Sequence, residues 1–146
     1  MIDTNVLLVS ISRRSIYHPI FQAFEDKRYN LLVTTDILNE YEEIIGERMG
    51  SITATAVLDG FWLVPNIVYI TKYFRFRLIT ADPDDDKFVD CAFVGNADFI
   101  VSNDHHFDVL KRIEFPKIQV ISADDFMEML TGNRPDLPQR LSLIHI

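Results

Sequence analysis

The sequence predicts an α/β fold: a three-layer sandwich with a central, mainly parallel sheet and helices on both faces. Short apolar runs of strand length alternate along the chain with amphipathic stretches of helical length. Consecutive parallel strands need right-handed crossover connections, and helices supply them. The 146 residues suit one domain with a full hydrophobic core. We therefore expect a single domain over residues 1–131, and a tail over residues 132–146 that lies outside the α/β pattern.

The first part of the chain begins with a very short strand at Ile2. Apolar residues at helical spacing predict a helix over residues 16–27. The run Leu31-Leu32-Val33 is typical of a buried strand. Thr34 can cap a helix over residues 37–49, because a threonine oxygen accepts a hydrogen bond from the first turn.

The rest of the chain continues the alternation. An acidic run around Pro83 suits the start of a helix over residues 82–95, since proline and acids favour helix N-termini. The run Phe99-Ile100-Val101 is typical of a buried strand, and Ser122 with Asp125 forms a capping box for a helix over residues 126–130. The other expected elements are a helix over residues 52–61, which Gly50 separates from the helix before it, and strands over residues 68–70 and 118–121.

Acidic residues recur at the edges of these apolar elements. Asp3 and Asp104 follow the first and the fourth expected strands, at the sheet edge where parallel α/β folds place their sites. Glu40 lies one turn into its helix. Asp86 and Asp90 are four residues apart, so they share one face of a largely apolar helix. These five carboxylates are the candidate site residues.

Carboxylates in such places predict a metal site. A buried charge is costly unless it is paired, and several carboxylates that converge need a cation between them. Oxygen ligands suit Mg²⁺ or Mn²⁺, which can activate a water for phosphodiester hydrolysis. The competing interpretations are a capping or turn role for Asp3 and a structural salt bridge for Asp86 and Asp90. Zinc is not expected at His105 and His106, because adjacent side chains diverge.

Composition narrows the partners. The net charge of −8 argues against a protein that general charge attraction holds on nucleic acid. Arg13 and Arg14 form a small basic patch that could contact RNA phosphates. A second basic group, interleaved with aromatic residues, consists of Lys72, Arg75 and Arg77. Cys91 has no partner for an internal disulfide, which favours a reducing cytoplasm, and no apolar run is long enough to span a bilayer.

Four ordered motifs resemble those of the PIN-domain family, over about residues 1–130. They are Asp3-Thr4-Asn5-Val6-Leu7, Ile37-Leu38-Asn39-Glu40-Tyr41, the run from Asp82 to Asp90, and the run from Ala97 to Asp104. The chain looks most similar to the prokaryotic toxin (VapC-like) branch. The resemblance implies a ribonuclease that depends on Mg²⁺ or Mn²⁺. It also implies a homodimer or larger oligomer and, in toxin members, inhibition by a cognate antitoxin protein.

The resemblance also implies roles for individual residues. Asp3, Glu40, Asp86 and Asp104 match the acidic set of the family, and Asp90 competes with Asp86 for its place. By the same comparison, Asn5 orients the first acid and Ser102 is a supporting hydroxyl.

Two other functions compete with a ribonuclease. One is a PIN fold without catalysis that binds RNA or protein, against which the retention of the acids argues. The other is an aspartyl-phosphate phosphatase, whose chemistry needs a second Asp two residues after the first, where this chain has Asn5.

Overall fold

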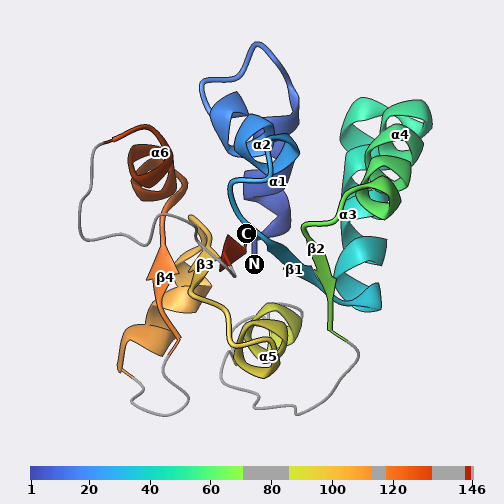
Figure 1. The fold of residues 1–146 in the computed structure, drawn as a ribbon. Coiled ribbons are helices and arrows are strands. Elements are labelled where there is room, and N and C mark those ends of the chain that lie inside the picture. The colour runs from blue at the N-terminus through green and yellow to red at the C-terminus, as the bar shows by residue number, and fades with distance from the viewer. Residues whose placement is uncertain (71–85, 113–117, 133–143, 146) are drawn as a thin grey trace.

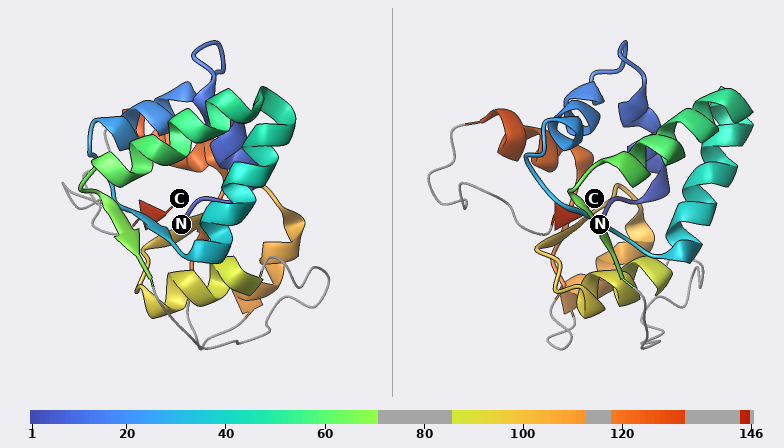
Figure 2. Two further views of the ribbon diagram at one scale, coloured as in Figure 1. Left: turned by 90° about the vertical axis from the view of Figure 1, so that its right-hand side faces the viewer. Right: turned by 45° about the vertical axis from the view of Figure 1, so that its right-hand side comes forward.

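The α/β architecture is confirmed. Short strands cross the middle of the molecule, with α1 (Thr4–Ile11) and α2 (His18–Glu25) on one side and α5 (Asp86–Val94) on the other (Figure 1). The computed structural model describes residues 1–70, 86–112, 118–132 and 144–145. The views in Figure 2 show the same layers from two further directions.

Every strand pair in the described residues is parallel. The strands are β1 (Leu31–Val33), β2 (Ile67–Tyr69), β3 (Phe99–Val101), β4 (Val120–Ile121) and β5 (Ile144–His145). β1 pairs with β2, and β3 pairs with β4 on one side and β5 on the other. The pairing therefore forms two small sheets, and β5 also contacts β1.

The remaining helices follow their expected positions, with one addition. They are α3 (Thr35–Met49), α4 (Ser51–Leu63), α6 (Ala123–Thr131) and a 3₁₀ helix, η2 (His105–Arg112), that the periodicity did not predict. Thr34 Oγ1 accepts a hydrogen bond from the Ile37 N–H at 3.2 Å, as its capping role requires. Ser122 Oγ accepts one from the Asp125 N–H at 3.0 Å. Gly50 ends α3 with φ +94°, a conformation that side chains with a Cβ rarely adopt.

The start and the tail of the chain differ from expectation. Ile2 makes a single parallel bridge to Val101 instead of a strand, and α1 begins only two residues later. The tail is not wholly outside the α/β pattern, because β5 pairs with β3 on the edge where Ile2 also pairs. A two-residue strand has no period for a pattern to detect, which explains the error. Residues 133–143 lie outside the described residues.

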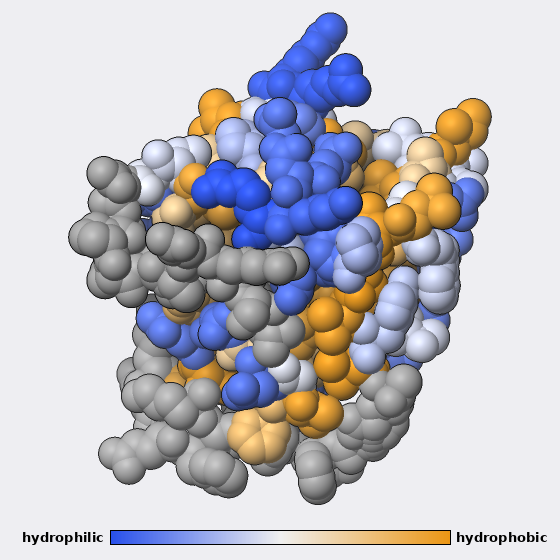
Figure 3. Space-filling view, in the orientation of Figure 1, coloured by the Kyte–Doolittle hydropathy of each residue, from blue (hydrophilic) through white to orange (hydrophobic). Residues whose placement is uncertain are grey.

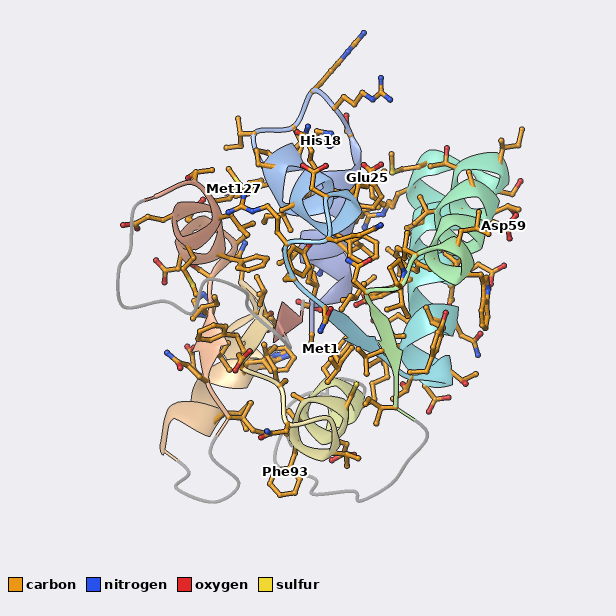
Figure 4. All side chains as sticks on the ribbon, in the orientation of Figure 1. Met1, His18, Glu25, Asp59, Phe93 and Met127 are labelled. Carbon is orange, nitrogen blue, oxygen red and sulfur yellow. The ribbon has the colours of Figure 1, made fainter. Side chains whose placement is uncertain are left out.

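The core lies between the strands and the helices on both sides. Met1 lies at the centre of the fold, where Figure 4 labels it, and is fully buried. The largest fully buried side chains include Tyr29, Tyr41, Phe88, Phe107 and Phe126. α5 buries Phe88, Val89, Cys91 and Ala92, whereas Val94 at its end is exposed. Within the described ranges, no helix has the length and apolar character needed to cross a membrane.

Candidate active site

Asp3 lies between the Ile2 bridge and the first turn of α1. Its backbone N–H donates to the Val101 carbonyl at 2.9 Å, which fixes the residue beside the carboxyl end of β3. Its side chain makes no capping hydrogen bond to α1 and instead accepts one from Ser102 Oγ at 2.8 Å. Asp3 is only 5% exposed. Capping therefore does not account for an acid at this position.

The electrostatics of Asp3 show that other acids lie near it. Burial, the largest cause, and the charges of Asp104 and Glu40 together raise the pKa of the Asp3 carboxyl from 3.8 to about 6. The hydrogen bond from Ser102 acts in the opposite direction, because it stabilises the charged form. At least one of the candidate acids therefore has a raised pKa. Burial is the larger cause, ahead of repulsion.

Glu40 reaches the site from α3. Its Oε2 accepts a hydrogen bond from the Thr4 hydroxyl, next to Asp3 in the chain. Its Oε1 accepts one from Lys87 Nζ at 2.8 Å, so Glu40 is half of an ion pair with α5. Tyr41, the next residue, is fully buried and its hydroxyl donates to the Ile2 carbonyl. This anchor places the carboxyl group of Glu40 toward the start of the chain.

Sequence reasoning missed Thr4 and Lys87 as site residues. Both lie inside the motifs that carry the resemblance, each directly after a candidate acid. Their position beside Asp3 and Asp86 was the available signal. Neither residue type is a metal ligand of the expected kind, so the search for carboxylates passed over them.

Asp104 closes the site from the end of β3. Its backbone N–H donates to Ser102 Oγ at 3.0 Å, so one hydroxyl links the loop of Asp104 to the carboxylate of Asp3. Asp104 Oδ1 accepts from the His106 N–H at 2.9 Å. His105 contacts Asp108 instead, with 3.4 Å between Nδ1 and Oδ2. The two histidines therefore diverge, as their adjacency predicts.

The remaining expected site residues have different surroundings. Asp86 begins α5, and its side chain lies outside the described part of the structure. Asp90 is half-buried on the same helix, where its charge helps to raise the pKa of the Cys91 thiol, although burial is the larger cause. The choice between the two acids stays open. Asn5 is exposed, and its orienting role stays a prediction.

Arg13 and Arg14 lie in the exposed loop between α1 and α2. This loop projects at the top of Figure 1, and hydrophilic side chains gather over it in Figure 3. Asp3 precedes the first residue of α1, and the loop follows its last residue. The loop is therefore about 12 Å from Asp3, the length of an eight-residue helix. The second basic group, Lys72, Arg75 and Arg77, falls outside the described residues.

The chemistry of the donors fits a hard divalent cation, because carboxylate oxygens are its preferred ligands. The described side chains do not assemble a complete cage: no group of three or more His, Cys, Asp or Glu among them could hold a metal ion as they lie. Both Glu40 oxygens already accept hydrogen bonds. Glu40 and Asp104 nevertheless each lie within electrostatic range of Asp3.

A family model described as PIN domain matches residues 1–106. This match spans more than half of the chain, and the chain belongs to the PIN-domain family. PIN domains are generally nucleases, which are hydrolases, and their nucleases typically use divalent metal ions. Comparisons with curated proteins and with solved structures gave no match.

Proposed function

We propose that this protein is a Mg²⁺- or Mn²⁺-dependent endoribonuclease. The observation that carries the proposal is the environment of Asp3: a buried carboxylate with a pKa of about 6, near the charges of Glu40 and Asp104. A cation among these acids would remove the repulsion that raises this pKa. Membership of a family of nucleases supports the reaction class.

The proposed ligands are Asp3, Glu40 and Asp104, with Asp86 or Asp90 as a fourth. When bound, the metal supplies an activated water and stabilises charge on the phosphate and the leaving oxygen. The side chains around the ligands restrict their orientation: Ser102 holds Asp3, and Thr4 holds Glu40. A fixed hydrogen-bond partner of this kind usually tunes both geometry and affinity.

The first test measures metal binding. Calorimetric titration with Mn²⁺ should show binding to the parent protein and weaker binding to Asp104→Asn, because one carboxylate ligand is lost. The matched control is Asp125→Asn, an exposed acid in the first turn of α6, which should leave the affinity unchanged. Equal affinity in the parent and in Asp104→Asn would remove Asp104 from the site.

The second test separates catalysis from stability. Asp3→Asn and Asp86→Asn should each lose Mn²⁺-dependent cleavage of a generic RNA by roughly 10- to 100-fold or more, because losing only the hydrogen-bond partner of a metal ligand commonly costs 10- to 100-fold. Their melting temperatures in chelator should not fall in parallel. If both variants cleave as well as the parent, the nuclease proposal fails and a PIN-fold binding module becomes the better account.

RNA contact by Arg13 and Arg14 is part of the same proposal. Their distance from Asp3 suits contacts with phosphates that flank the cleaved bond. The double variant Arg13→Ala/Arg14→Ala should bind RNA more weakly. A plot of log affinity against log salt concentration should also be less steep, because each phosphate contact that is lost reduces the slope by roughly 0.7 for single-stranded RNA, and one or two contacts are expected to be lost. An unchanged slope would show that neither arginine contacts phosphate.

We also propose that the protein is the toxin of a toxin–antitoxin pair and forms a homodimer. A gene immediately upstream that encodes a small DNA-binding protein would support the toxin assignment, and the absence of such a gene would count against it.

The proposal of a homodimer rests on exposed apolar side chains of α4. They are Ile52, Trp62 and Leu63, which are 85%, 68% and 85% exposed. Leu63 follows Trp62, and Trp62 stacks on the exposed Tyr69 with 5.1 Å between ring centroids, and an exposed apolar cluster of this kind favours burial against a second copy. Sedimentation should show that the parent is a dimer and that Leu63→Glu is a monomer. A monomeric parent would refute the proposed homodimer.

A further inference from the structure

Lys87 is a cation inside an acidic site. Its Nζ lies 2.8 Å from Glu40 Oε1, and the two side chains are 22% and 27% exposed. The same Nζ lies 5.3 Å from the centroid of the Phe88 ring, whose side chain is fully buried. The ammonium is thus held at the boundary between the core and the acids by the start of α5. Glu40 in turn is close enough to Asp3 to raise the pKa of that carboxyl.

The contacts of Glu40 show a conflict between this ion pair and a metal. One carboxylate oxygen accepts from Thr4 and the other from Lys87, so both oxygens have partners. A cation that binds Glu40 must displace at least one of them. The hydroxyl of Thr4 is neutral and can stay beside a metal-bound carboxylate. The ammonium of Lys87 carries a like charge to the metal, so it is the partner that metal binding would expel.

We propose that Lys87 is the exchangeable counter-ion of this site, and that it competes with the divalent metal for Glu40. This inference rests on the proposed function, because it assumes that Glu40 is a metal ligand. In the metal-free protein, Lys87 offsets part of the charge of Glu40, an acid that adds to the repulsion around Asp3. Metal binding releases the ammonium from Glu40. Lys87 therefore sets how tightly the site takes its metal, acting as a positioning residue through Glu40.

The physical strength of the pair sets the size of the effect. The two side chains are about one quarter exposed, so solvent screens their attraction. Metal binding must break the ion pair and place a divalent ion near the displaced ammonium. We expect these two costs to weaken metal binding by about three- to tenfold relative to a site without the lysine. The competition should therefore be measurable without abolishing metal binding.

The experiment is calorimetric titration of Mn²⁺ into the full chain, without RNA, for the parent, Lys87→Met and Lys87→Arg. Methionine keeps an unbranched side chain over Phe88 and removes the charge, and all three residues have similar helix propensity. Lys87→Met should bind Mn²⁺ about three- to tenfold more tightly than the parent. Lys87→Arg keeps the charge and should stay within about twofold of the parent, since arginine can pair with the same carboxylate.

A second comparison separates the ion pair from the general field of a positive charge. The gain from Lys87→Met should disappear in a Glu40→Gln background, because the pair no longer exists there. An equal gain in both backgrounds would show a field effect and overturn the role of Glu40. If Glu40→Gln binds too weakly to titrate, the comparison of Met with Arg at position 87 decides alone.

The outcomes distinguish this inference from the function beneath it. If the parent binds Mn²⁺ and Asp104→Asn binds it more weakly, but Lys87→Met binds no more tightly than the parent, only the counter-ion role of Lys87 is overturned. If neither the parent nor Lys87→Met binds Mn²⁺, the metal-dependent function fails together with it. Circular dichroism of each variant in chelator shows whether the fold is retained.

Discussion

At the scale of single residues, Asp3 is a group whose charge opposes folding. Its pKa rises from 3.8 to about 6 in the folded protein, chiefly through burial. Between these values the folded state holds a proton that the unfolded state has lost, so stability falls as the pH rises through this window. Above pH 6 the penalty is complete and amounts to about 3 kcal/mol, at 1.36 kcal/mol for each pKa unit.

The first prediction follows from that sign. In chelator, Asp3→Asn should be more stable than the parent above pH 7, by up to about 3 kcal/mol, and the difference should vanish below pH 4. The asparagine carbonyl can still accept the hydrogen bond from Ser102. Urea unfolding from pH 3.5 to 8 measures the difference, with Asp59→Asn on the exposed face of α4 as the matched control. A parent more stable than Asp3→Asn at pH 8 would contradict a destabilising buried charge at Asp3.

At the scale of elements, the end of α5 approaches β1 very closely. Gly95 follows the last residue of α5, and its N–H donates to the Cys91 carbonyl at 2.9 Å. A Cβ at this position would lie 2.0 Å from Cδ2 of Leu32, a fully buried residue of β1. The absence of a side chain is therefore what lets α5 pack against the strand. The same packing holds Lys87 and Asp86 at the other end of the helix.

The second prediction compares two glycines. Gly95→Ala should lower the free energy of unfolding by about 1–3 kcal/mol, because Leu32 must leave its position in a packed core. Gly60→Ala, in α4 with no atom within 4 Å of the added Cβ, should raise it by about 0.5–1 kcal/mol through helix propensity. Chemical denaturation of both variants gives the comparison. Equal effects of the two changes would show that the close approach at Gly95 does not exist.

At the scale of the whole molecule, the site depends on contacts between distant parts of the chain. Ser102 contacts Asp3 across 99 residues, and Lys87 contacts Glu40 across 47. Tyr41 joins α3 to the start of the chain by its hydrogen bond to the Ile2 carbonyl. Because Glu40 precedes Tyr41 and Asp3 follows Ile2, this one bond holds two candidate ligands in a common frame.

The third prediction tests that frame. Tyr41→Phe should cost about 1–2 kcal/mol of stability, through a lost buried hydrogen bond, and should weaken Mn²⁺ binding several-fold. Tyr29→Phe is the matched control, since Tyr29 is also buried and donates to the Ile20 carbonyl at 2.6 Å, away from the acids. It should lower stability alone. Thermal melting measures the loss of stability, and calorimetry measures the Mn²⁺ affinity. Equal Mn²⁺ affinity in the two variants would show that the hydrogen bond of Tyr41 does not position the metal ligands.

Local pattern was enough to predict most elements. The caps at Thr34 and Ser122 and the stop at Gly50 act within one turn of the chain, and the structure has all three. Two of the errors occur where an element is too short to show a period, and two eight-residue helices, α1 and the 3₁₀ helix after Asp104, were also not predicted. Ile2 forms one bridge, β5 has two residues, and the 3₁₀ helix after Asp104 follows no apolar pattern that the sequence analysis used.

The sequence by itself determined the α/β class, the approximate positions of most helices and the candidate acids, because periodicity, capping and carboxylate chemistry are local properties of the chain. The tertiary structure alone decided which of those acids interact electrostatically and which side chains contact them. It brought Asp3, Glu40 and Asp104 together, gave Asp3 its raised pKa, and placed Lys87 on Glu40. Such pairings depend on burial and on packing between elements far apart in the chain, and no short window of residues contains that information.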